Sequence, residues 1–261
     1  MINKNNLLAK IVVFDSGLGS LSIIKEIQKI AKTDIVYFAD QKNYPYGTKS
    51  QAQLNTIMKK TINLLEEKFT PDIIVVASNT PSLMLNLQTN KIVDVKPPLK
   101  LAQKKSKSKK IAILGTKSAI NSKGLKNYIK ENNIPKTYKI FKINGSNLVD
   151  LVESGKFLNK KNYCKKIIKE SLENYIIKEK IDTITLSSTH LLFLKILLKK
   201  EFPQIRFIDP GNLVAKEILI KIKNKQSKRN SLKIFTSGNI IDFKNKLNKI
   251  GIKNKINYLS I

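Results

Sequence analysis

Small polar residues follow several short apolar segments of this 261-residue chain. Ser78, Asn79 and Thr80 come directly after the apolar segment 73–77, and Ser188, Thr189 and His190 follow the β-branched segment 184–186. Two strands that deliver hydroxyl, amide and imidazole groups can bind a small charged molecule from both sides. Ser, Thr and Asn are also the favoured helix N-caps, so helix capping stays an alternative for each turn.

Two further turns carry groups that can bind a ligand. The turn 15–20 (DSGLGS) precedes a helix-like segment, and a glycine-rich helix start offers free backbone N–H groups to an anion. It has neither the GxGxxG spacing of a dinucleotide site nor the Gly-Lys-Ser/Thr of a phosphate loop. In the turn 40–50, which contains YPYGT at 44–48, Pro45 and Gly47 fix the backbone, and we expect Tyr46 and Thr48 to project their hydroxyls.

The segments that must position these turns alternate between two types. Apolar, β-branched strands are predicted over 11–14, 35–38, 73–77, 111–114, 184–186 and 207–208. Amphipathic helices are predicted over 21–30, 51–68, 125–130, 160–180 and 191–200. This alternation indicates an α/β protein with mainly parallel sheets, whose sites lie at the carboxyl ends of the strands.

A break and a partial repeat suggest two halves. Segment 96–110 contains Pro97, Pro98 and then six lysines, so we expect it to be irregular, solvated and a domain boundary. IVVFDSG at position 11 has a counterpart in IAILGTK at 111, and DIIVVASNT at 72 has one in DTITLSSTH at 182. Two such pairs in the same order predict two similar α/β halves facing each other across a cleft.

Composition narrows the function classes. The chain has 49 Lys+Arg against 19 Asp+Glu, a net charge of +30, but only Arg206 and Arg229 are arginines. Nucleic-acid readers rely on arginine, so we interpret the charge as compositional drift and expect no specific nucleic-acid partner. One cysteine, Cys164, and one histidine, His190, exclude a disulfide framework and a Cys/His metal site.

The sequence also bears on location. No apolar segment approaches the roughly 20 residues of a membrane span. The N-terminus lacks the apolar stretch and small-residue cleavage site of a signal peptide. We therefore expect a cytoplasmic protein without a membrane partner.

The motifs FDSGLGSLS, FAD followed by PYGTKS, SNT, LVESG and STH together resemble the aspartate/glutamate racemase family, most closely its glutamate racemases. IDPGNLVA and FTSGN resemble the closing segments of the family. The resemblance implies two pseudo-symmetric doubly wound domains, here 1–98 plus 209–261 and 99–208, with the active-site cleft between them. It further implies cofactor-independent interconversion of L- and D-glutamate by two-base proton transfer, which supplies D-glutamate for peptidoglycan, and a homodimer.

The resemblance also assigns residues. By position, the substrate contacts would be Asp15, Ser16, Tyr46, Gly47, Asn79, Thr80, Thr189 and His190. Proton transfer would be assisted by Asp15, Glu153 and His190. The two catalytic positions, which are cysteines in the family, fall on Ser78 and Ser188.

The two serines are a chemical departure. A cysteine has a pKa of about 8.5 and is partly thiolate at neutral pH, whereas a serine hydroxyl acts only with an adjacent base. His190 beside Ser188 and Asp15 near Ser78 are candidate bases. Three alternatives stay open: a glutamate racemase with weak or lost activity, a catalytically inactive amino-acid-binding protein on the same fold, and the use of aspartate or another acid as substrate.

Overall fold

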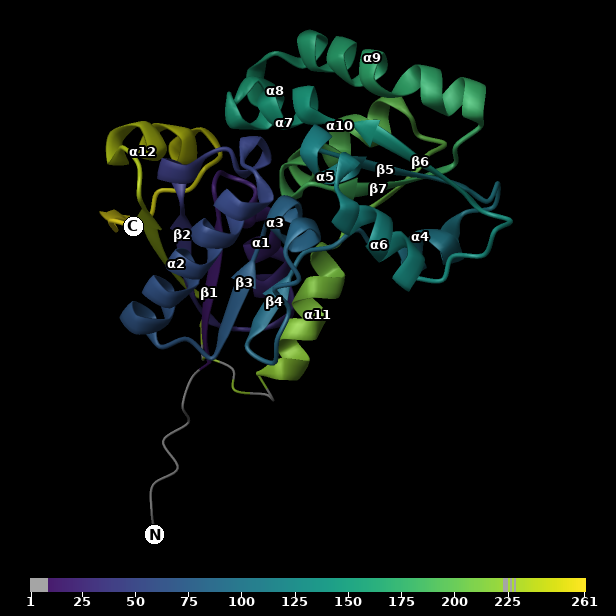
Figure 1. The fold of residues 1–261 in the computed structure, drawn as a ribbon. Coiled ribbons are helices and arrows are strands. Elements are labelled where there is room, and N and C mark those ends of the chain that lie inside the picture. The colour runs from purple at the N-terminus through teal and green to yellow at the C-terminus, as the bar shows by residue number, and fades with distance from the viewer. Residues whose placement is uncertain (1–8, 223–224, 226, 228) are drawn as a thin grey trace.

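The computed structural model describes residues 9–222, 225, 227 and 229–261. The prediction about a signal peptide concerns residues 1–8, which lie outside the described residues. Within the described part of the chain, no helix has both the length and the apolar character to cross a membrane. The chain builds two parallel sheets, each covered by helices on both faces (Figure 1).

The first sheet takes strands from both ends of the chain. Its order is β10-β9-β2-β1-β3-β4, and every described pairing is parallel. The strands are β1 (Lys10–Asp15), β2 (Asp34–Ala39), β3 (Ile73–Val76), β4 (Ile92–Asp94), β9 (Ser231–Thr236) and β10 (Ile256–Tyr258). The central strands are apolar on both faces because helices cover both, as in β3, whose four residues are all buried.

Helices from distant parts of the chain cover this sheet. One face packs against α1 (Ser20–Ile30), α11 (Gly211–Lys221) and α12 (Ile240–Lys249). The other face packs against α2 (Gln51–Phe69), which begins with a capping box between Ser50 and Gln53. The short helix α3 (Asn79–Met84) follows β3 directly, which places the SNT turn at the carboxyl edge of the sheet.

The second sheet is formed by the middle of the chain. Its order is β6-β5-β7-β8, all parallel, with β5 (Lys110–Gly115), β6 (Lys139–Asn144), β7 (Thr183–Ser187) and β8 (Arg206–Ile208). One face carries α7 (Ser146–Glu153), α8 (Lys156–Asn159), α9 (Lys161–Glu179) and α10 (Lys195–Glu201). The other carries α5 (Lys117–Asn121) and α6 (Lys123–Glu131). The chain passes from the first sheet to the second after β4 and returns after β8.

The predicted fold class, α/β with mainly parallel sheets, is confirmed. Two local predictions are wrong. Segment 96–110 contains a helix, α4 (Leu99–Lys105), since Leu99 and Ala102 are buried and outweigh the lysines around them. The helix predicted over 191–200 is divided, because a 3₁₀ helix, η3 (Thr189–Leu194), precedes α10 and continues the turn after β7.

Candidate active site

A narrow cavity of about 50 Å³ lies where the carboxyl ends of strands from both sheets meet. Ten of the predicted site residues line it: Asp15, Ser16, Tyr46, Gly47, Ser78, Asn79, Thr80, Ser188, Thr189 and His190. Glu153, the remaining one, contacts His190. The catalytic and binding roles of these residues stay predictions.

Asp15 ends β1 and is buried at the base of the cavity. The backbone N–H of Ser16 donates to its Oδ1 over 2.6 Å, and the Thr189 hydroxyl lies 3.4 Å from its Oδ2. Burial raises the pKa of Asp15 to about 6, although the charge of His190 and hydrogen bonds from Ser16 and Ser78 act in the opposite direction. At neutral pH this carboxylate is therefore ionised yet able to accept a proton.

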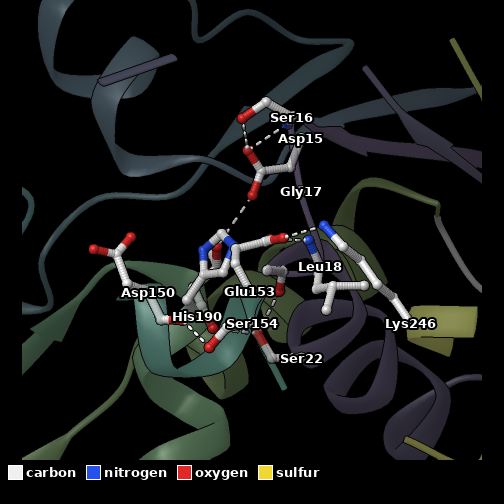
Figure 2. A network of polar contacts seen from close by, with 12 residues as sticks. Asp15, Ser16, Gly17, Leu18, Ser22, Asp150, Glu153, Ser154, His190 and Lys246 are labelled. Carbon is white, nitrogen blue, oxygen red and sulfur yellow. Dashed lines mark hydrogen bonds and ion pairs between the residues drawn. The ribbon is translucent and has the colours of Figure 1, made fainter. Parts of the chain in front are cut away.

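Glu153 ends α7 and forms a buried pair with His190 (Figure 2). Its Oε1 lies 2.6 Å from Nε2 of His190 and accepts the backbone N–H of Leu18 over 2.7 Å. Burial acts to raise the pKa of Glu153, but the hydrogen bond and charge of His190, the Leu18 N–H and Lys246 together lower it to about 2. Glu153 is therefore ionised throughout the neutral pH range.

His190 responds to the same contact. Burial acts to lower the pKa of His190, but the hydrogen bond to Glu153 and the charges of Glu153 and Asp15 raise it above its usual value. An imidazole in this setting carries a proton near neutral pH and can donate it. The cavity is therefore lined by a carboxylate that can accept a proton, Asp15, and by an imidazole that can donate one, His190.

Ser78 and Ser188 occupy equivalent positions, each in extended conformation directly before a helix. In the described structure neither side chain makes a capping hydrogen bond. The helix-capping alternative is therefore wrong for these two residues, and their hydroxyls are available to the cavity. Ser78 acts to lower the pKa of the Asp15 carboxyl, and Ser188 precedes His190 by two residues.

The amide of Asn79 has one free acceptor. Its Nδ2 donates to the carbonyl of Val95 over 2.8 Å, whereas its buried Oδ1 has no partner among the described residues. A buried acceptor without a donor costs free energy, so it favours a ligand that supplies an N–H. Thr80 lies beside it, with its hydroxyl 3.3 Å from that of Thr116, across the two sheets.

The turn 44–48 differs from prediction. The Tyr46 hydroxyl donates to Oδ2 of Asp40 over 2.9 Å, and the Thr48 hydroxyl donates to the carbonyl of Pro45 over 3.0 Å. These hydroxyls therefore stabilise the turn and do not project from it, because each finds a local acceptor. Tyr46 and Gly47 still line the cavity.

Five residues that line the cavity had no site role assigned from sequence: Tyr44, Pro45, Thr116, Val149 and Ser187. Thr116 belongs to the GTK turn that repeats the first DSG turn, so the internal repeat was the signal that could have found it. No group of three or more His, Cys, Asp or Glu residues suited to a metal gathers anywhere in the described part of the chain.

Known proteins resemble this chain in sequence and in fold. No family model matches the chain. A glutamate racemase of Buchnera aphidicola (subsp. Schizaphis graminum) is 33% identical over 230 residues, which cover 85% of this chain and 88% of that protein. The fold matches that of a glutamate racemase isoform from Bacillus anthracis with a TM-score of 0.82, at 24% identity over 97% of both chains.

A second solved structure, of Escherichia coli glutamate racemase in complex with L-glutamate and the activator UDP-MurNAc-Ala, has a TM-score of 0.80. The two sequences are 22% identical, and the match covers 97% of this chain and 98% of that one. At this identity the likeness shows a shared fold alone. Membership of the family rests on the identity of more than 30% to the Buchnera protein over most of both sequences. The chain therefore belongs to the glutamate racemase family.

Proposed function

We propose that this protein is a glutamate racemase that interconverts L- and D-glutamate without a cofactor, with serines at both cysteine positions of the family. The observation that carries the proposal is that both serines line one cavity together with two titratable groups, Asp15 and His190. Ser78 acts on the pKa of Asp15, and Ser188 precedes by two residues His190, which contacts Glu153. The unpartnered Oδ1 of Asn79 offers an acceptor to the ammonium group of an amino acid.

The proton transfers follow from these residues. In one direction, the α-proton leaves one face of the substrate and passes through the Ser78 hydroxyl to Asp15. The His190 imidazolium then supplies a proton through Ser188 to the opposite face of the α-carbanion, which inverts the centre. The reverse reaction exchanges the two roles. Since a hydroxyl relays protons but is not itself ionised, we expect turnover about 10²–10⁴-fold below that of a thiolate site.

The serine substitutions support a second candidate, an amino-acid-binding protein that has lost catalysis. The groups proposed to bind the substrate, Asn79, Thr80 and Thr189, would serve a binding protein equally well. The two candidates differ only in whether the α-proton exchanges with solvent.

Deuterium exchange separates them. The protein is incubated with L-glutamate in D₂O, α-deuterium is followed by NMR, and binding is measured separately by calorimetry. Exchange above the buffer rate, abolished in Asp15→Asn, supports the racemase. Calorimetric binding without exchange rejects it in favour of the binding protein. The same pair of measurements with L-aspartate decides between the two acids.

We place the reaction in the cytoplasm, where D-glutamate would enter peptidoglycan synthesis, and we propose that the protein works as a homodimer without a nucleic-acid partner. We also propose domains 1–98 plus 209–261 and 99–208. The strand ranges support this division, because each sheet draws its strands from one of the two sets. Light scattering of the purified protein tests the dimer.

A further inference from the structure

Glu153 accepts donors from three different elements. Oε1 accepts from His190 of η3 and from the backbone of Leu18, and Oε2 faces Nζ of Lys246 at 3.4 Å (Figure 2). Lys246 belongs to α12, which covers the first sheet, whereas Glu153 belongs to α7, which covers the second. This ion pair therefore joins the two sides of the molecule directly behind the imidazole of the site.

The packing of α12 aims Lys246 at this point. Phe243 and Leu247 are buried against the first sheet, and the ring of Phe243 lies 6.1 Å from that of Tyr37. Lys246 lies next to this buried face, and its side chain is 38% exposed. Lys244, on the same helix, is exposed. The helix thus directs one particular lysine toward the buried carboxylate.

The charge of Lys246 matters because of the other charges around His190. His190 faces two carboxylates, Glu153 from α7 and Asp15 from β1, and the one cation acting on it from α12 is Lys246. A buried imidazole between two carboxylates would be held as a permanent imidazolium. An imidazolium whose pKa is raised too far is a poor proton donor, whereas a racemase needs this group to release and to accept a proton in alternate turnovers.

We propose that Lys246 is a positioning residue of this site, whose ammonium pairs with Glu153 so that His190 can both release and accept a proton. The consequence for turnover rests on the proposed racemase function, but the electrostatic coupling does not. In agreement with the geometry, the charge of Lys246 lowers the pKa of both Glu153 and His190.

The test uses the fact that His190 is the single histidine of the chain. Its imidazole resonances need no assignment, so an NMR pH titration of the full-length protein without substrate follows one group. In Lys246→Met the titration midpoint of His190 should move to higher pH. Lys246→Arg should keep the wild-type midpoint, and Lys244→Met, the same substitution at an exposed position of α12, should leave it unchanged.

A Lys246→Met midpoint that is unchanged or lower overturns the proposal, as does an equal shift in Lys244→Met. Lys246→Gln is measured in parallel, so that a folding defect of the methionine variant does not decide the outcome. The titration needs no turnover, and its result is therefore independent of whether deuterium exchange succeeds. If exchange is measurable, the Lys246→Met pH profile should move to higher pH together with the titration.

Discussion

Oε1 of Glu153 and Nε2 of His190 lie 2.6 Å apart, and both side chains are about 8% exposed. The pKa of the carboxyl is lowered and that of the imidazole is raised, so both groups are charged near neutral pH. Breaking a buried pair of this kind leaves one charge without its partner, which costs more than the pair itself contributed. The pair is therefore a point at which stability and chemistry can be tested together.

Glu153→Gln removes the carboxylate but keeps the side-chain size. We expect the free energy of unfolding to fall by about 3 kcal/mol, measured by urea denaturation at pH 7. Glu173→Gln is the matched control, since Glu173 is about half exposed and its Nζ–Oε1 distance to Lys169 is 4.0 Å. That variant should lose no more than about 1 kcal/mol. Equal losses in the two variants would contradict a special role for the buried pair.

Asp15 gives stability a defined pH dependence. Its pKa is about 6 in the folded protein, against an ordinary value of 3.8, so ionised Asp15 destabilises the fold above pH 6, and this cost vanishes below pH 3.8. Asp15→Asn should therefore be more stable than the wild type at pH 8, by on the order of 2–3 kcal/mol. The advantage should shrink as pH falls from 6 to 4. A difference that stays constant over this range would show that the carboxyl does not titrate there.

Gly19 is required for space rather than for backbone conformation. Its φ of −55° and ψ of −39° suit alanine, but a Cβ there would overlap the Thr189 hydroxyl and stand 2.8 Å from Oδ2 of Asp15. We expect Gly19→Ala to cost about 1–3 kcal/mol in urea denaturation and to weaken calorimetric binding of glutamate. The adjacent Ser20→Ala should be neutral or stabilising, because the buried Ser20 hydroxyl has no described partner. A stabilised Gly19→Ala would refute the steric argument.

Restoring the cysteines tests the chemistry. The double variant Ser78→Cys with Ser188→Cys should raise α-deuterium exchange by about 10²–10⁴-fold, because thiolates replace hydroxyl relays. Ser187→Cys is the control: Ser187 also lines the cavity, but its hydroxyl lies 2.9 Å from that of Thr185. If the folded, ligand-binding double variant exchanges no faster, loss of the thiols does not explain low activity.

Six strands could be predicted from sequence, whereas β4, β6, β9 and β10 could not. β1, β3 and β7 are buried on both faces and form continuous apolar or β-branched runs. β4 and β10 have three residues each, and β6 alternates lysines with apolar residues. Strands that are short or partly exposed leave a weak pattern in the sequence, and their pairing depends on neighbours far away in the chain.

The site shows the same division. Its turns were visible because each directly follows a predicted strand, and parallel strands bring their carboxyl ends together. The role of Lys246 could not be predicted, because its partner Glu153 lies 93 positions away and nothing in the sequence distinguishes this lysine from the others. The orientation of the Tyr46 hydroxyl was predicted wrongly for a related reason. Its acceptor, Asp40, lies six positions earlier in the chain, and only the folded backbone brings the two side chains together.

The two passages of the chain between the sheets, after β4 and after β8, have a mechanical consequence. Rotation of the two sides about these two crossings would open the mouth of the cavity. The same rotation would pull Leu18 and Lys246 away from Glu153, because these two residues belong to the first side and Glu153 belongs to the second. Such a rotation would leave the Glu153–His190 pair on one side and remove Lys246 from it, so opening of the cavity would also change the charge around the imidazole.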